Sequence, residues 1–239
     1  MERRSLPKPM ALRPIYYDTE TTGISATDDR IIELAAFDPV RDRTYCQLIQ
    51  PGRPIPPDAT AIHNISDEMV ADAPTFKEAA PEFIQFCEGE TVLIAHNNDQ
   101  FDIHFLRQEF QRAEQEMPAW KFLDSLKWAR RYRPDLPRHS LQFLREIYGF
   151  PANNAHRALD DVIILAQVFG CLIDDLPIDK VLELMQTKRK LKTMPFGKHK
   201  GEALESLPKS YLKWLAGTGA LDKEGNEELK YSLEALGAL

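Results

Sequence analysis

The sequence has few cysteines and no long apolar run, and each shortage excludes a class of protein. Its three cysteines, Cys46, Cys87 and Cys171, are far apart and odd in number, and none forms a CxxC pair. This set gives no sign of a disulfide framework, a zinc site or redox work, so we expect buried, reduced thiols. No stretch approaches the roughly 18 uncharged apolar residues of a membrane helix. We therefore expect a soluble, globular protein with no membrane partner.

The N-terminus also lacks the features of a secretion signal. Residues 1–14 carry basic side chains and three prolines but no apolar segment. A signal peptide needs such a segment, the h-region. We predict that residues 1–12 form a flexible tail and that the protein is cytoplasmic.

Basic residues are also fewer than acidic ones. The chain has 30 Lys and Arg against 37 Asp and Glu, a formal net charge of −7. This balance argues against a nucleic-acid binder, because phosphates attract a positive surface. The objection weakens if the acids gather where cations bind. Basic clusters do exist, each with a solvated surface as the alternative explanation: Arg130, Arg131, Arg133 and Arg138 form one, and Lys188 to Lys200 another.

Apolar periodicity predicts the order of strands and helices. Three consecutive apolar runs predict strands at 15–17, 31–37 and 44–49. Further strands are predicted at 91–95 and 121–123, and helices at 76–84, 99–116, from 124 onward, at 140–148 and at 157–174. Strands that first follow one another and then alternate with helices indicate an α/β fold with a sheet of mixed direction.

The length and a change in composition predict how the chain is divided. A chain of 239 residues can bury one catalytic core and leave a small accessory unit. Between Lys188 and Lys200 six basic residues occur with no acid among them, around the turn signal Pro195-Phe196-Gly197. We predict a main domain at 13–175, a linker at 176–190 and a small, mostly helical module at 191–239.

Four carboxylates and one histidine stand where strands end and helices begin. Asp18 and Glu20 are two apart in a strand, so both project from one face and repel each other unless a cation lies between them. Asp102 follows a later strand at the start of a helix, where the helix dipole favours an acid. His156 and Asp161 open another helix, a spacing that lets an aspartate reach a metal and a histidine reach an attacking water. Taken singly, each has a plain structural explanation, such as a strand end or a helix cap.

Together these residues resemble the three motifs of the DEDDh exonucleases in the ribonuclease H-like superfamily. The motifs read Asp-x-Glu at 18–20, Asn-x-x-x-Phe-Asp at 97–102 and His-x-x-x-x-Asp at 156–161. Family landmarks also occur at 62–69, 124–126 and 139–141, so the resemblance covers about residues 13–175. It implies a five-stranded mixed sheet flanked by helices and a 3′→5′ exonuclease activity. The segments 195–201 and 211–215 are similar to the C-terminal module of the bacterial exodeoxyribonuclease X branch.

The resemblance also implies a set of roles. Four residues would bind two Mg²⁺ (or Mn²⁺) ions, hard cations that prefer oxygen ligands. Asp18 would bridge them, Glu20 and Asp161 would bind the ion that activates water, and Asp102 would act near the leaving group. His156 would be the general base, because an imidazole pKa lies near the operating pH. The resemblance also implies contacts with the terminal nucleotide, which would be made by Thr21, Thr22, His63, Ile65, Asn97 and Phe101. For Ile65 and Phe101 the alternative is a position in the core.

Ile24 is a further candidate, because it follows Thr21-Thr22-Gly23 in a loop beyond the first strand. Gly23 would allow the backbone to turn sharply there and place Ile24 at the lip of the cleft that admits a 3′ end. An apolar side chain at that place would wedge against the last base pair of a duplex. The alternative is that Ile24 is buried beneath the loop.

The expected function is therefore 3′→5′ trimming of DNA ends to 5′-mononucleotides, in DNA repair, with single strands and also duplex ends as partners. Three alternatives stay open. An RNA exonuclease of the RNase T or oligoribonuclease kind would share the motifs, which do not read the 2′-hydroxyl. A proofreading subunit bound to a polymerase would share them too, and a non-catalytic scaffold would keep the fold alone. Monomer and homodimer are both compatible with the sequence.

Overall fold

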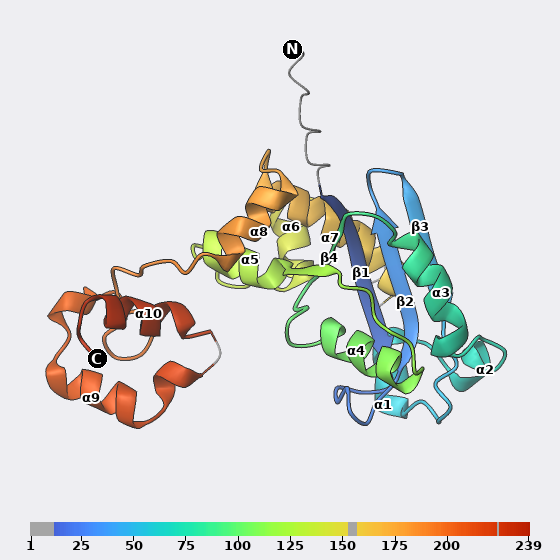
Figure 1. Cartoon of the computed structure of the whole chain (residues 1–239), viewed down its shortest axis with the longest axis horizontal. Coiled ribbons are helices and arrows are strands. Elements are labelled where there is room, and N and C mark those ends of the chain that lie inside the picture. The colour runs from blue at the N-terminus through green and yellow to red at the C-terminus, as the bar shows by residue number, and fades with distance from the viewer. Residues whose placement is uncertain (1–11, 153–156, 224) are drawn as a thin grey trace, which may run out of the picture. The chain divides into compact units, whose positions relative to one another are not determined.

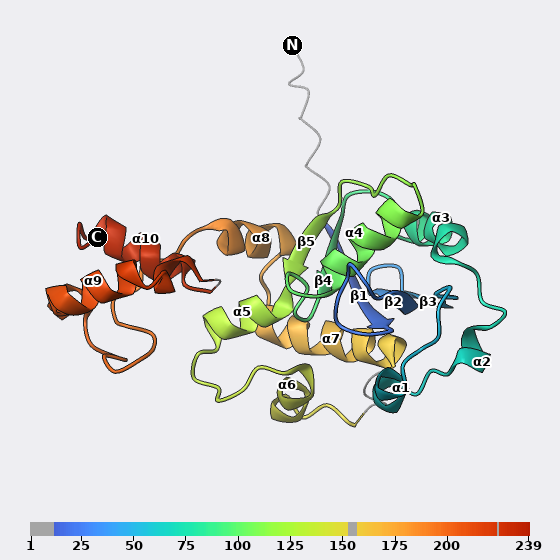
Figure 2. The ribbon, with the colours of Figure 1, turned by 90° about the horizontal axis from the view of Figure 1, so that it is seen from below.

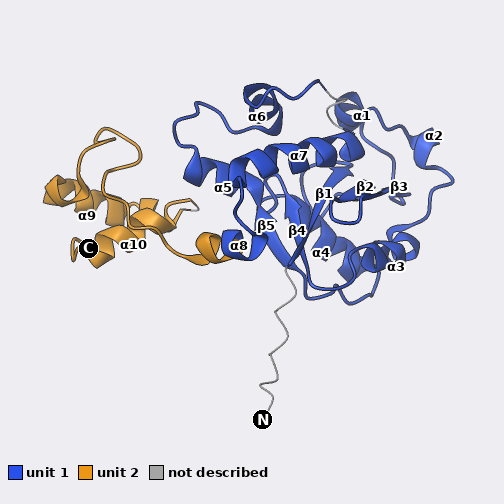
Figure 3. Cartoon of the chain, turned by 90° about the horizontal axis from the view of Figure 1, so that it is seen from above, with its two compact units in different colours: residues 1–181 blue, residues 182–239 orange. Residues whose placement is uncertain are grey.

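The structure, a computed structural model, describes residues 12–152, 157–223 and 225–239. The chain divides into two compact units, Met1–Val181 and Leu182–Leu239 (Figure 3). Of the predicted N-terminal tail, residues 1–11 lie outside the described part. Within the described part, no helix is long and apolar enough to cross a membrane.

Unit 1 is built on a five-stranded sheet. The strands are β1 (Arg13–Thr21), β2 (Ile31–Asp38), β3 (Arg43–Leu48), β4 (Thr91–Ala95) and β5 (Lys121–Asp124). Their order is β3-β2-β1-β4-β5. Strand β2 is antiparallel to β1 and β3, whereas β4 is parallel to both β1 and β5. The predicted α/β fold with a mixed five-stranded sheet is confirmed.

Helices cover both faces of this sheet (Figures 1 and 2). Helices α3 (Phe76–Phe86) and α4 (Asp102–Arg112) lie on one face, and α7 (Ala158–Ile173) lies on the other against β1 and β2. Helices α5 (Ser125–Tyr132) and α6 (Leu141–Ile147) pack on α7. The proline-rich stretch after β3 leads into two short helices, α1 (Pro57–His63) and α2 (Asp67–Val70).

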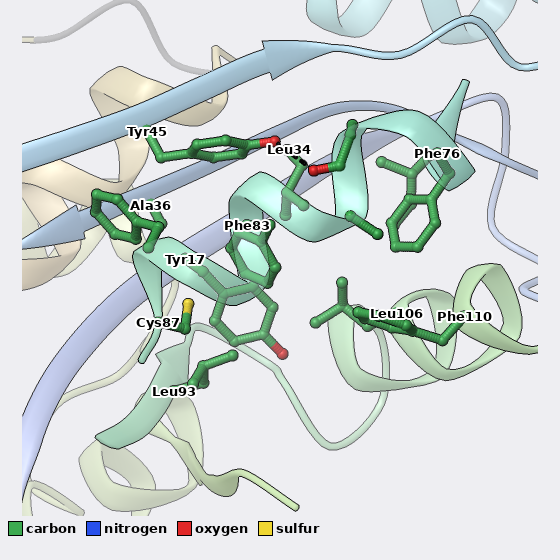
Figure 4. Close-up of a cluster of buried hydrophobic side chains, with 14 of the residues drawn as sticks. Tyr17, Leu34, Ala36, Tyr45, Phe76, Phe83, Cys87, Leu93, Leu106 and Phe110 are labelled. Carbon is green, nitrogen blue, oxygen red and sulfur yellow. Dashed lines mark hydrogen bonds between the residues drawn. The ribbon is translucent and has the colours of Figure 1, made fainter. Parts of the chain in front are cut away.

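Alternation along β1 decides which side chains meet which helix. Tyr17 is fully buried in the apolar cluster that β1, β2 and β4 form with α3 and α4 (Figure 4). Its neighbour Tyr16 points the other way and meets Phe169 of α7 edge-on, with ring centroids 6.2 Å apart. Because side chains of a strand alternate between faces, Asp18 and Glu20 share the face of Tyr16 and look toward α7.

The cysteines correct one expectation. Only Cys87 is buried, whereas Cys46 and Cys171 are exposed. Cys46 follows the buried Tyr45 on β3, so its side chain takes the opposite, outer face of an edge strand. Cys171 lies near the end of α7, on the side of that helix that faces solvent. All three thiols are free.

Unit 2 has a small apolar core of its own. Helix α9 (Lys209–Gly217) and helix α10 (Glu227–Ala235) pack with two short 3₁₀ segments, η1 (Leu204–Ser206) and η2 (Ala220–Asp222). A bridge between Thr193 and Ala203 closes the loop that precedes η1. Helix α8 (Ile178–Gln186) occupies most of the stretch predicted as a linker, and the division between the units falls within it.

Candidate active site

Three of the four predicted metal ligands come together in unit 1. Asp18 and Glu20 extend from β1 and Asp161 from the first turns of α7, and one ligand atom from each lies within 4.8 Å of the others. Asp161 is 9% exposed. A strand and a helix that are distant in sequence thus place three carboxylates on one side of the sheet.

The electrostatics of this cluster favour a cation. Burial, followed by the charges of Asp102 and Glu20, raises the pKa of Asp18 well above its usual value. Burial, followed by the charge of Glu33, raises the pKa of Glu20 to about 8. Carboxylates held this close resist ionisation because like charges repel in a poorly solvated site. A divalent cation relieves that repulsion, and its preference for oxygen ligands fits this donor set.

This repulsion predicts how the metal-free protein responds to pH. A carboxyl whose pKa is raised on folding binds its proton more tightly in the folded chain, so stability falls as the pH rises between the unfolded and folded pKa values. For Glu20 that window runs from 4.5 to about 8. One pKa unit corresponds to about 1.4 kcal/mol, and about 1 kcal/mol moves the Tm of a domain of this size by roughly 2–4 °C. With EDTA present, Tm is expected to fall by about 5 °C or more between pH 5.5 and 8.

Differential scanning fluorimetry with EDTA or with MgCl₂ checks this prediction across the same pH range. The stabilisation by Mg²⁺ should grow with pH, since the ion replaces protons that the cluster no longer holds. Melting curves that coincide with and without Mg²⁺ at pH 8 would contradict a cation site here.

Asp102, the fourth predicted ligand, is not one of the three converging carboxylates and lies at the start of α4, on the other face of the sheet. It begins α4, is 2% exposed and accepts a hydrogen bond from the Thr19 hydroxyl at 2.8 Å. Burial raises the pKa of Asp102 to about 7, while the bond from Thr19 opposes that rise. Its charge also acts on Asp18, so the two carboxyls share one electrostatic environment. Its role as a ligand remains a proposal.

Asp124 holds the loop that leads to Asp102. One carboxylate oxygen accepts hydrogen bonds from the backbone N–H groups of Leu126 at 2.8 Å and Asn97 at 3.2 Å, and the other accepts from the N–H of Asp99 at 3.1 Å. It therefore caps α5 and fixes the turn between β4 and α4 together. The family landmark at 124–126 has its physical reason in these bonds.

Glu33 is a site residue that the sequence reasoning missed. It is 1% exposed, faces Glu20 across the β1 and β2 pair, and accepts bonds at 3.0 Å from both the Arg157 guanidinium and the Ala158 N–H. Glu33 thereby anchors the start of α7, the helix that carries Asp161. The one sequence signal was an acid inside the apolar run 31–37, which periodicity alone assigns to the strand.

The loop after β1 carries Ile24, whose side chain is 89% exposed, so the buried alternative is wrong. The loop is held from behind, because the Arg112 guanidinium donates to the backbone oxygens of residues 26, 27 and 29 at 2.8–3.0 Å. Thr21 and Thr22 are buried. The Thr21 hydroxyl donates to the Gly23 carbonyl, and the Thr22 hydroxyl donates to the Asp29 carboxylate, so both form hydrogen bonds within this loop. Gly23 has no unusual φ, but a Cβ there would lie 2.3 Å from the Asp29 carboxylate and would displace it from its bonds with Thr22 and Ser25.

The predicted base and sugar contacts differ in how accessible they are. Ile65 is fully buried in a small cluster with Ile32 and Ile55, so its expected contact with the nucleotide is replaced by a core position. Ile65 lies between α1 and α2, and its side chain packs in the same cluster as Ile32 of β2. His63 is 2% exposed, and its Nδ1 accepts from the Ile65 N–H at 3.0 Å. Phe101 and Asn97 are partly exposed.

The predicted general base, His156, lies outside the described residues. A second histidine close in sequence to the motifs, His96, is unsuited to that role. Burial lowers the pKa of His96 to about 4, so its ring is neutral near pH 7. Its Nε2 donates to the His139 carbonyl at 2.8 Å and its Nδ1 therefore accepts from the Ser125 hydroxyl at 2.8 Å.

The predicted arginine cluster is divided by the structure. Arg130 and Arg138 line a cavity of about 490 Å³ together with His96, Asn97 and His139. Arg133 instead pairs with Asp135 at 2.9 Å and donates to the Tyr148 hydroxyl at 2.8 Å, so its charge is already used. Two of the four arginines therefore line the cavity beside Asn97.

Two family models match the chain. Residues 15–169 match the RNase T model, described as "Exonuclease". Residues 179–232 match a model described as "Putative quorum-sensing-regulated virulence factor".

Curated relatives match over the first of these regions. DNA polymerase III subunit epsilon of Treponema pallidum (strain Nichols) is 38% identical over 164 residues, which cover 66% of this chain and 74% of the relative. The chloroplastic/mitochondrial exonuclease DPD1 of Arabidopsis thaliana is 36% identical over 184 residues, which cover 70% of this chain and 58% of the relative.

Solved structures share the fold. Exonuclease X in complex with 5′ overhanging duplex DNA is 27% identical with a TM-score of 0.53, over 67% of this chain and 91% of that chain. Exonuclease I of E. coli in complex with a dA16 oligonucleotide is 22% identical with a TM-score of 0.62, over 75% of this chain and 44% of that chain. At that identity the second likeness supports the fold alone.

Proposed function

The chain belongs to the RNase T exonuclease family and is a 3′→5′ exonuclease of the DEDDh type with a ribonuclease H-like fold, and we propose that its substrate is DNA. It would release 5′-mononucleotides from DNA 3′ ends by two-metal-ion hydrolysis, in DNA repair. The convergence of Asp18, Glu20 and Asp161 within 4.8 Å carries the proposed hydrolysis. The choice of DNA is supported by the relative named DNA polymerase III subunit epsilon and by the similarity to exonuclease X, which was solved with duplex DNA. A cytoplasmic location remains a prediction of the sequence.

The family implies a divalent metal, and the acidic cluster fits one. We propose two ions, Mg²⁺ or Mn²⁺, held by Asp18, Glu20, Asp161 and Asp102. When bound, they supply an activated water and stabilise the charge that develops on the phosphate and the leaving 3′ oxygen. Without a bound cation, the carboxyls of Asp18, Glu20 and Asp102 hold protons more tightly than usual, as their raised pKa values indicate.

The protein's own residues would orient the strand and move the proton. Glu33 and Arg157 fix the start of α7 and with it Asp161. Asp124 fixes the turn that presents Asn97 and Asp102. His156 would take the proton from the attacking water. Phe101 would offer an apolar surface to a base, which grips without reading sequence.

A comparison of DNA with RNA tests the substrate. We expect the full chain with Mg²⁺ or Mn²⁺ to shorten a single-stranded DNA oligonucleotide at least about tenfold faster than an RNA of the same sequence. Mononucleotides released over time are quantified by chromatography. Faster loss of RNA would move the enzyme to the RNase T or oligoribonuclease kind, and absence of any release from both would favour a scaffold.

Ile24 should matter for duplex ends more than for single strands. As an exposed apolar side chain on a supported loop, it would stack on the last base pair while the terminal nucleotide separates, and unstacking costs a few kcal/mol per step. We expect Ile24→Ala to slow the trimming of blunt duplex DNA by roughly 3- to 10-fold and that of single strands far less. Rates on both substrates and a melting curve measure this.

Val40→Ala is the matched control, since Val40 is 66% exposed in a turn remote in sequence from the motifs. Its rates should match those of the wild type on both substrates. Equal losses on duplex and single strand for Ile24→Ala would show that Ile24 does not act as a wedge.

Proofreading is the second candidate function. It is favoured by the relatives named DNA polymerase III subunit epsilon, among them the protein from Treponema pallidum. Repair as an independent enzyme is supported instead by the similarity to exonuclease X over 91% of that chain. Efficient trimming of fully paired ends by the isolated chain would support repair, because a proofreading subunit receives an end that the polymerase has already separated.

A further inference from the structure

Unit 2 contains an aromatic cavity that has no part in the catalytic site. It has a volume of about 480 Å³, and its lining includes Phe196, Lys198, Ser210, Tyr211 and Trp214. Cavities of about 300–1,000 Å³ with an apolar lining and a few polar groups are typical ligand sites. The described lining has one cation and no acid.

The floor of the cavity is a stacked pair of rings. Tyr211 and Trp214 of α9 lie 5.6 Å apart at 18°, and Tyr211 is buried against the core of unit 2. Trp214 is 56% exposed, whereas Trp128 in unit 1 is 1% exposed. A large ring supported from below and open above is a platform on which a planar group can stack.

A loop with two glycines places Lys198 over the Tyr211 ring of this stacked pair. Gly197 has φ 73°, which strains any other residue, and a Cβ there would lie 3.1 Å from the Tyr211 hydroxyl, so glycine favours this close approach of the loop. Gly201 closes the loop by donating its N–H to the Met194 carbonyl at 2.8 Å. The Lys198 ammonium lies 5.4 Å from the centre of the Tyr211 ring. Positive charge and an aromatic surface are therefore presented together.

Lys198 is the one charged residue of the described lining. Its neighbour His199 lies against Tyr211 and is 2.9 Å from the Glu202 carboxylate. The segment 188–200 that carries Lys198 contains six Lys or Arg and no acid, and among the described residues no ion pair engages Lys190, Lys192, Lys198 or Lys200. A lysine without an ion pair beside an aromatic platform, in a basic segment, complements a polyanion with planar groups, and a nucleic-acid strand has both features.

We propose that this cavity binds single-stranded DNA, with one base stacked on Trp214 and backbone phosphates held by Lys198 and the neighbouring lysines. Stacking tolerates every base, as a nuclease without sequence preference needs. The choice of DNA rests on the proposed function. The site would give the enzyme a second point of contact with the strand that it shortens, so it should matter for long strands and not for very short ones.

The test uses the full chain. Binding is measured by fluorescence anisotropy in EDTA, with a labelled dT20 and a labelled dT3, for the wild type and for Trp214→Ala, Trp214→Phe and Lys198→Ala. We expect Trp214→Ala to weaken binding of dT20 by about 5- to 50-fold and to leave dT3 unchanged, with Trp214→Phe retaining most of the affinity. Lys198→Ala should lower the slope of log affinity against log salt by about 0.7. Trimming of dT3 with Mg²⁺ should be unaffected.

Leu236→Ala is the control for folding of unit 2, because Leu236 is 44% exposed and lines a different cavity of the same unit. Unchanged dT20 binding by Trp214→Ala, or an equal loss with Leu236→Ala, overturns the proposal. So does displacement of dT20 by polyglutamate as readily as by unlabelled dT20, because the site would then recognise charge alone. If the wild type released no nucleotides from DNA, the proposed function would fail, whereas normal trimming with unchanged binding by Trp214→Ala would defeat this inference only.

Discussion

Replacing Asp18 with alanine is expected to reduce the release of nucleotides from single-stranded DNA at least about 10³-fold, because residues that act as a unit fail together when one is removed. Asp18 is central to the cluster, since the charges of Asp102, Glu20 and Asp161 all act on its carboxyl. Losing it removes the proposed bridge between two cations. Glu20→Ala, Asp102→Ala and Asp161→Ala should show comparable losses.

The fold should survive these changes, and the metal-free Asp18→Ala and Glu20→Ala variants should be at least as stable as the wild type near pH 8, because a repelling charge has been removed. Steady-state trimming with Mg²⁺ and a melting curve measure the two effects separately. Asp160→Asn is the matched control, since it changes the neighbouring aspartate on α7, which is not one of the three converging carboxylates. Near-normal trimming by Asp18→Ala would refute the assignment of the site.

Much of this site could be predicted because it depends on the spacing of residues within single strands and helices. Two carboxylates two residues apart in a strand, such as Asp18 and Glu20, share one face of the sheet. Asp161 lies in the first turns of an apolar helix, which was expected to pack on that sheet. The strands β1, β2 and β3 and the helices α3, α4 and α7 follow the apolar periodicity of their segments. The structure adds the fact that Asp161 approaches from the same side as Asp18 and Glu20.

What the sequence did not reveal depends on contacts between distant segments. Glu33 acquires its role only because β2 lies beside β1 and below the start of α7, a pairing that no local pattern contains. Ile65 and Ile24 are both apolar residues in loops, yet one is fully buried and the other is 89% exposed. Ile65 packs in a cluster with Ile32 of β2, whereas Ile24 belongs to none of the apolar clusters of the described residues. Cys46 is exposed because β3 is an edge strand, which its composition does not show.

In unit 2, too, local patterns could be predicted from the sequence, whereas contacts between separate segments could not. Its basic composition was visible in the sequence, but the stack of Tyr211 on Trp214 and the approach of Lys198 were not. The spacing of residues 211 and 214 is that of one helical turn, which places both rings on one side of α9. Only the fold of the preceding loop brings the lysine to the same side.

His156→Ala is expected to lower the rate of trimming by about 10² to 10⁴, the usual cost of removing a general base, while metal and DNA still bind. The carboxyls of the cluster are committed to a cation or to shared protons, and His96 is neutral with both ring nitrogens engaged. The unperturbed pKa of an imidazole lies near neutral pH, which suits a proton acceptor at pH 7. Single-turnover trimming measures the loss, and titration calorimetry with Mn²⁺ measures metal binding. His104→Ala is the control, because His104 is exposed on α4 and should leave the rate unchanged. If His156→Ala no longer bound Mn²⁺, His156 would be a metal ligand; if it trimmed DNA at the wild-type rate, the proton would have to leave the water by another route.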